Sequence, residues 1–144
     1  MQRAFVMMSL ALATAFTTCA QRRELRGYDP SSPPLAKTEV EKKILAVLDR
    51  VAKDHETYLN VPMLDGRALR LLTEAVDAKH VVEIGTSTGY SGLWFCLALE
   101  TTGGHLTTFE IDHGRATMAR GHFGEAGVDK IVTIVEGNAH ENVT

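Results

Sequence analysis

The stretch His80–Ser91, H-V-V-E-I-G-T-S-T-G-Y-S, decides the fold of this 144-residue chain. The aliphatic residues within Val81–Ile84 are all β-branched, as in a strand that is buried on both faces. Gly85 ends this run because glycine accepts backbone angles that other residues resist. T-S-T-G then favours a turn, and from Tyr90 the sequence is apolar enough to predict a helix packed on a sheet.

A junction of strand, glycine turn and helix favours the binding of a small molecule. The first turn of a helix has backbone N–H groups without helical partners and carries the positive end of the helix dipole. We therefore expect an anionic or polar ligand above the strand that ends at Ile84.

Composition limits the function classes. A net charge of −3 and a pI near 6.0 give no electrostatic reason to expect nucleic acid as a partner. The two cysteines, Cys19 and Cys96, form no disulfide framework, and neither has a neighbour at metal-ligand spacing. Cys96 lies in the apolar segment after the glycine turn, where a buried, inert thiol is expected.

Residues 1–20 have the pattern of a secretory signal peptide. Arg3 supplies a positive start, Ala4–Phe16 is apolar, and Thr18 and Ala20 occupy the two small-residue positions before a cleavage site. The apolar run is shorter than the about 20 residues that span a bilayer, so we expect cleavage and no stable membrane span afterwards. Cleavage predicts a periplasmic or secreted protein; without it the protein would be cytoplasmic or membrane-anchored.

Residues 21–37 are polar and hold three of the four prolines, which is typical of a linker or mobile arm. Arg22, Arg23 and Arg26 could contact anionic lipid, although a solvated stretch is the simpler interpretation. A lipid-modified Cys19 fits poorly because the residues before it do not resemble a lipoprotein box.

Two helices are predicted before the central strand, at the start of a domain spanning 38–144. Thr38 and Glu41 form a capping box that opens the first helix. Pro62 prevents this helix from continuing, and Asp65 is a good N-cap for a second one. The second helix is expected to direct three apolar residues inward: Leu69, Leu72 and Val76.

Strands and helices alternate after the glycine turn. His105–Glu110 and Ile131–Glu136 are predicted strands, and Arg115–Ala126 is a predicted helix closed by Gly127. This alternation predicts an α/β fold with parallel strands and right-handed crossovers.

Ligands of such sheets bind outside the carboxyl ends of the strands. Glu110 ends the second strand and could accept both hydroxyls of a ribose, although a solvated acid at a strand end is the alternative. The spacing of Gly85 and Gly89 lacks the dinucleotide signature G-x-G-x-x-G, which disfavours a Rossmann oxidoreductase. Glu83 would repel a phosphate and suits a cationic ligand. A ribose, a carboxylate and an ammonium or sulfonium group together describe S-adenosylmethionine.

Four motifs resemble one enzyme family: 60-NVPMLDGRALRLL-72, 81-VVEIGTSTGYSGLW-94, 107-TTFEID-112 and 135-VEGNA-139. Their order and spacing are similar to the bacterial branch of the S-adenosylmethionine-dependent O-methyltransferases related to caffeoyl-CoA and catechol O-methyltransferases. The resemblance covers Thr38 to the end of the chain. It implies the N-terminal half of a Rossmann-like class I methyltransferase sheet, with about three parallel strands and flanking helices.

The resemblance also implies a cofactor-binding set. Val61 would lie over the methionine moiety, Glu110 would accept the ribose, and Ala139, with Asn138 beside it, would border the adenine. The amino-acid part of the cofactor would be surrounded by Glu83, Gly85, Thr86, Tyr90 and Ser91.

The family's next segment supplies a fourth strand, an Asp-rich metal site and a lysine that can act as a base. This sequence stops at Thr144, before any of them, so no catalytic or metal-ligating residue is assigned and a truncated product or fragment is expected. The first strand should then have an unpaired edge. The six histidines fall into no ligand spacing, and only His140 stands apart because it follows the expected adenine segment. The serines of the turn form no nucleophile elbow.

The expected function is methyl transfer to a catechol- or phenol-like hydroxyl of a small molecule, with a divalent metal only in the full-length family enzyme. The alternative is a non-catalytic exported binding or assembly module. Both a monomer and a homodimer are compatible with the sequence.

Overall fold

Three parallel strands form the sheet of this protein, whose computed structural model describes residues 32–54 and 59–142. The strands are β1 (His80–Ile84), β2 (His105–Glu110) and β3 (Val132–Glu136), in the order β1-β2-β3. Val82 pairs with Thr107, and Thr107 pairs with Thr133. Among the described residues β1 pairs with β2 alone, so the predicted half-sheet and its unpaired edge are confirmed.

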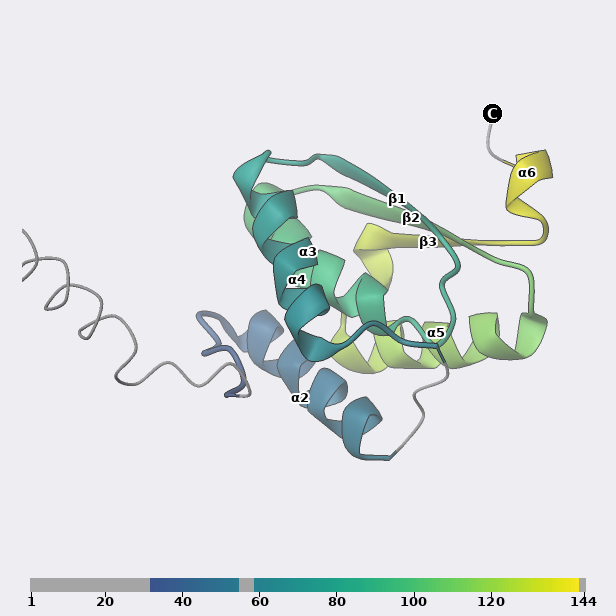
Figure 1. Ribbon diagram of the computed structural model, residues 1–144. Helices are drawn as coiled ribbons and strands as arrows, with labels where there is room; N and C mark the ends of the chain where they lie inside the picture. Colours follow the sequence, from purple (N-terminus) through teal and green to yellow (C-terminus); the bar gives the residue numbers. More distant parts are fainter. Residues whose placement is uncertain (1–31, 55–58, 143–144) are drawn as a thin grey trace, which may run out of the picture. The chain divides into compact units, whose positions relative to one another are not determined.

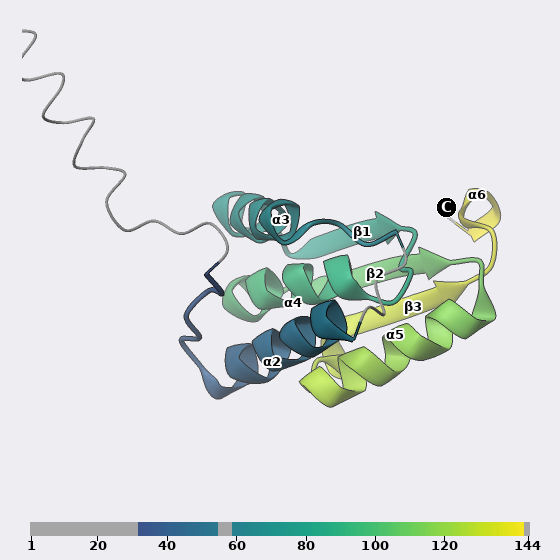
Figure 2. The ribbon, with the colours of Figure 1, turned by 60° about the horizontal axis from the view of Figure 1, so that its bottom comes forward.

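Four helices lie on one side of this sheet (Figure 1). They are α2 (Glu39–Lys53), α3 (Met63–Ala75), α4 (Tyr90–Thr102) and α5 (His113–Ala126). Helices α4 and α5 contact the sheet directly, and α2 packs against both of them. Helix α3 lies along α4, on the side of the β1 edge (Figure 2). A short 3-10 helix, η1 (Asp129–Ile131), precedes β3, and a one-turn helix, α6 (Ala139–Asn142), follows it.

Helices α2, α3, α4 and α5 lie over one face of the sheet (Figure 1). The other face is open at β1, whereas Phe109 of β2 on that face is only 6% exposed. Leu106 and Thr108 of β2 point to the covered face and are fully buried. Val82 and Ile84 of β1 point to the open face, where they are 55% and 71% exposed. The prediction that β1 is buried on both faces is therefore wrong for the described residues, because no described helix covers the open face of β1.

Helix α3 differs from its prediction in its start and in its buried side. It begins at Met63, two residues before the predicted cap, because Pro62 is the N-cap. Leu72 and Val76 are 63% and 73% exposed, so their predicted inward direction is wrong. The helix turns Gly66 toward α4 so closely that a Cβ there would collide with Trp94, and this contact leaves the leucine-bearing side of α3 outside.

The other predicted elements are confirmed with small shifts at their ends. The Thr38 hydroxyl accepts a hydrogen bond from the N–H of Glu41 and caps α2 as expected. Asp112 caps α5, which therefore begins two residues earlier than predicted, and β3 begins one residue late because Ile131 ends η1. The predicted signal peptide and most of the predicted linker fall outside the described residues, so both stay predictions. No helix within 32–54 or 59–142 is both long and apolar enough to span a membrane.

Candidate functional site

The glycine turn links the end of β1 to the start of α4 in an unusual backbone conformation. Gly85, Ser87 and Gly89 have φ angles of +92°, +50° and +84°. Glycine adopts such angles without a steric cost, whereas a serine there is uncommon. The N–H groups of Gly85 and Thr86 both donate to the carbonyl of Phe109 on β2, at 2.9 and 3.0 Å. The turn is thus anchored to the neighbouring strand before it enters the helix.

Glu83 lies partly buried on the covered face of β1, just before this turn. Its carboxylate accepts hydrogen bonds from the hydroxyls of Ser91 at 2.5 Å and Thr108 at 2.7 Å. Burial raises the pKa of Glu83, the two hydroxyl donors partly offset this rise, and the charge of Glu110 adds to it. A cation bound nearby would relieve the cost of keeping this carboxylate ionised.

Glu110 ends β2 on the other side of the turn and is only 4% exposed. One carboxylate oxygen accepts the N–H of Ser87 at 2.7 Å, and the other accepts the N–H of Asp112 at 2.9 Å. These two bonds hold the carboxylate in one orientation. Each oxygen retains a further acceptor position, which suits a ligand that presents two hydroxyl donors.

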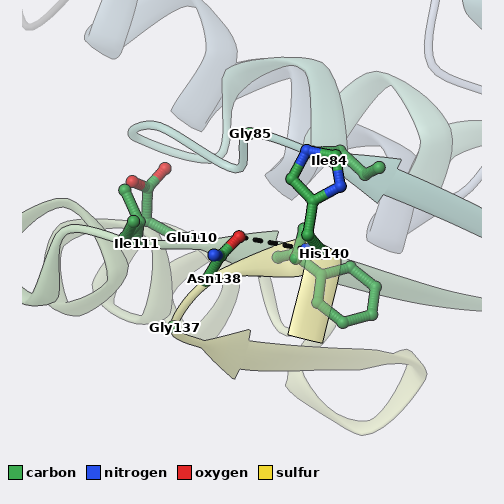
Figure 3. A pocket seen from close by; sticks show the side chains of 9 residues that line it. Ile84, Gly85, Glu110, Ile111, Gly137, Asn138 and His140 are labelled. Carbon is green, nitrogen blue, oxygen red and sulfur yellow. Dashed lines mark hydrogen bonds between the residues drawn. The ribbon is translucent and has the colours of Figure 1, made fainter. Parts of the chain in front are cut away.

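Two hollows meet at Ile84 and Gly85. The larger, about 510 Å³, extends toward the carboxyl ends of β2 and β3 (Figure 3). The smaller, about 270 Å³, extends toward Glu83 and the segment before α3. A Cβ on Gly85 would meet nothing within 4 Å, so the backbone of this residue faces open space between the hollows. One carboxylate lines each hollow, Glu83 the smaller and Glu110 the larger.

Six of the eight predicted cofactor-binding residues line these hollows. The smaller hollow is lined by Val61, Glu83, Gly85 and Ser91, and the larger by Gly85, Glu110 and Ala139. The other two have side chains elsewhere. The hydroxyl of Thr86 is buried against that of Thr108 at 2.7 Å, and the side chain of Tyr90 lines a different pocket, beside Trp94.

The structure adds residues that the sequence reasoning did not assign to the ligand. Ser87 lines the smaller hollow, and its Oγ is buried with no hydrogen-bond partner in the part of the chain that the structure describes. Phe109, Ile111 and His140 line the larger hollow (Figure 3). The sequence T-S-T-G places Ser87 in the turn. Only the structure shows that Ser87, with its positive φ angle, lines the smaller hollow with a buried hydroxyl.

The described residues hold no group of three or more His, Cys, Asp or Glu side chains that could bind a metal ion. Cys96 is buried, as expected, and has no disulfide partner within the described residues; burial raises the pKa of its thiol.

The sequence model of the O-methyltransferase family matches residues 36–144. A catechol O-methyltransferase from Niastella koreensis is 33% identical over 96 residues, which are 67% of this chain and 43% of that protein.

Solved structures share the fold. An O-methyltransferase from Bacillus cereus in complex with S-adenosylhomocysteine has a TM-score of 0.60 and 28% identity, over 76% of this chain and 48% of its own. The O-methyltransferase TomG from Streptomyces achromogenes, in complex with S-adenosylmethionine, has a TM-score of 0.58 and 29% identity, over 74% of this chain and 46% of its own. The chain therefore spans less than half the length of each of these relatives.

Proposed function

Because this chain belongs to the O-methyltransferase family, we propose that it binds S-adenosylmethionine across Gly85 and serves methyl transfer to a small-molecule hydroxyl of catechol or phenol type. The observation that carries the proposal is the pair of oriented carboxylates in two adjoining hollows, Glu83 in the smaller and Glu110 in the larger.

The residues present fit this cofactor. Glu83 is a desolvated carboxylate that favours a cation, which matches the ammonium of the methionine moiety. The partnerless hydroxyl of Ser87 lies in the same hollow and can donate to the cofactor carboxylate. Glu110 can accept the two ribose hydroxyls, and Ala139 and Asn138 border the remaining space for the adenine. Relatives in complex with S-adenosylmethionine and S-adenosylhomocysteine support the same assignment.

The bound cofactor would supply a methyl group on a positively charged sulfur. In this proposal Glu83 holds the methionine part of the cofactor and Glu110 holds its ribose. In the family, a divalent metal and a base act on the acceptor hydroxyl, and the resemblance assigns them to a segment beyond the third strand. We therefore propose that residues 1–144 hold the donor and do not by themselves transfer the methyl group.

Calorimetric titration with S-adenosylhomocysteine tests the binding step. The chain should bind it weakly, and Glu110→Gln should raise Kd about tenfold or more, because a charge-assisted pair of hydrogen bonds is lost. Glu136→Gln is the matched control: this acid ends β3 in the same way but lines neither hollow, so Kd should not change. Equal effects of the two variants would contradict the assignment of Glu110.

A labelled-methyl assay with catechol and Mg²⁺ tests the second part of the proposal. We expect no transfer above background from the chain alone. Turnover would show that a base or metal ligand lies within these residues.

The sequence pattern of residues 1–20 supports a second candidate, a non-catalytic exported module built on the same half-fold. Expression followed by fractionation and intact-mass measurement separates the two. A species cleaved after Ala20 outside the cytosol favours the exported module, and an uncleaved cytosolic protein that binds the cofactor favours the first proposal.

A further inference from the structure

Thr88 lies at the centre of the glycine turn but lines neither hollow. It is fully buried, and two segments far from it in sequence hold it in place. The side-chain amide of Asn60 donates to the Thr88 hydroxyl at 3.1 Å. On the opposite side, Nδ1 of His122 lies 2.7 Å from the Thr88 carbonyl oxygen.

The hydrogen bond from His122 has a defined direction. A carbonyl oxygen only accepts, so Nδ1 of His122 must carry the proton and donate it. His122 belongs to α5, is 6% exposed and lines neither hollow. Its bond to Thr88 therefore reaches the ligand site through the turn.

The turn needs such support because its backbone is strained at Ser87, directly before Thr88. Ser87 has a φ of +50°, a left-handed conformation that is unfavourable for a residue other than glycine. Gly89, on the other side, has a φ of +84°. The N–H of Ser87 also donates to Glu110, so a shift of the turn would move the donor that orients this carboxylate. Asn60 itself lines the smaller hollow beside Val61, so its hydrogen bond to Thr88 joins this wall of the site to the turn.

We propose that His122, together with Asn60, is a positioning residue that clamps Thr88 and thereby sets the affinity of the site for the cofactor. The proposal rests on the proposed binding of S-adenosylmethionine. His122 holds the strained turn, the turn presents the N–H of Ser87 to Glu110, and Glu110 receives the ribose.

The test uses the full chain and S-adenosylhomocysteine as the titrant. His122→Leu removes the donor and leaves the buried Thr88 carbonyl unpaired, so Kd should rise about tenfold. His122→Asn keeps an N–H donor close to the position of Nδ1 and should restore Kd to within about threefold of the parent. A merely structural role for His122 would not predict this rescue.

Val128→Ala is the matched control, because it removes buried methyl groups just after α5 without touching the turn. It should lower stability and leave Kd unchanged at a temperature where all variants are folded. A Kd for His122→Leu equal to that of the parent, or an equal rise for Val128→Ala, would overturn the proposal.

Hydrogen exchange tests whether His122 holds the turn, independently of cofactor binding. Without any ligand, the amide of Ser87 should exchange about tenfold faster in His122→Leu than in the parent, and at the parental rate in Val128→Ala. Suppose that the parent binds no S-adenosylhomocysteine while the exchange of the Ser87 amide is still faster in His122→Leu. That result would contradict the cofactor assignment but support the role of His122 in holding the turn. An unchanged exchange rate in His122→Leu overturns the clamp.

Discussion

The two faces of the sheet are built from the same strands but have opposite environments. On the covered face, Leu106 and Thr108 are fully buried beneath α4 and α5. On the open face, Val82 and Ile84 are more than half exposed, although they come from the most apolar run of the strand. The difference shows that a β-branched run predicts a strand, whereas burial depends on which elements reach each face.

Helix α3 likewise has one side packed against a neighbour and one side exposed. Its Gly66 side contacts Trp94 of α4, while Leu64, Leu71 and Leu72 are 53–66% exposed. Its buried side was set by the close approach that a glycine permits rather than by the largest apolar residues.

The largest difference in stability is expected between substitutions of a buried and an exposed leucine. Leu97 of α4 is fully buried, and Leu97→Ala should lower the free energy of unfolding by about 2–5 kcal/mol, because it removes apolar contacts and leaves a cavity. Leu72→Ala, on the exposed side of α3, should change it by less than about 0.5 kcal/mol. Urea unfolding monitored by circular dichroism measures both, and similar losses would contradict the exposure of α3.

Two helical glycines give the next contrast. A Cβ on Gly92 would lie 2.7 Å from the ring of Phe123, so Gly92→Ala should cost about 1–3 kcal/mol through overpacking. A Cβ on Gly121 would meet nothing within 4 Å, and Gly121→Ala should stabilise α5 by about 0.5–1 kcal/mol. Thermal unfolding measures whether each variant is less or more stable than the parent. A Gly92→Ala variant as stable as the parent would mean that Phe123 moves aside freely.

A buried ion pair between α2 and α3 gives a smaller, pH-dependent effect. Glu41 is buried, accepts the N–H of Lys37 and pairs with Arg70 at 2.6 Å. Burial alone would raise the pKa of Glu41, but these two partners outweigh it and hold the pKa below its usual value. Glu41→Gln should cost about 1–2 kcal/mol at pH 7, because the charge on Arg70 loses one of its partners.

The sign of the pH effect follows from the lowered pKa. The Glu41 carboxylate stabilises the fold fully above its unfolded pKa of about 4.3, and this stabilisation is lost as the pH falls through the lower folded pKa. The difference in the free energy of unfolding between the parent and Glu41→Gln should therefore become smaller as the pH is lowered. Glu39→Gln, at an exposed position of the same helix turn, should change the free energy of unfolding by less than about 0.5 kcal/mol.

The smallest change in the free energy of unfolding is expected for a substitution on the open face of β1. Val82→Thr should change the free energy of unfolding by less than about 0.5 kcal/mol, since this side chain is already 55% in water. Val81→Thr is its matched partner on the same strand, packed against the core, and should cost about 1 kcal/mol. Equal losses would show that the two faces of β1 are equally covered in solution.

Much of the candidate site could be predicted from the sequence. Glu83, Gly85 and Glu110 follow from a strand, a glycine turn and a second strand in the right order, and the structure brings them together around one site. Thr86 and Tyr90 were expected beside the ligand, but their side chains point elsewhere. The direction of a side chain in a tight turn depends on φ angles that several sequences can adopt, so spacing alone does not determine it.

The clamp on Thr88 was beyond sequence reasoning for a different reason. His122 is 34 residues from Thr88, and its ring reaches the turn only because α5 packs beside the start of α4. A lone histidine in an amphipathic helix has the same local pattern whether it faces solvent or a buried carbonyl.

The sequence by itself determined the type and order of the elements, the glycine turn at the end of β1 and the two carboxylates that mark the site. These features depend on local backbone preferences and on residue spacing along one segment. Only the tertiary structure decided which face of the sheet is covered, which side of α3 is buried and which residues hold the turn. These features depend on contacts between distant segments, whose free energy comes from packing and hydrogen bonding that no single segment contains.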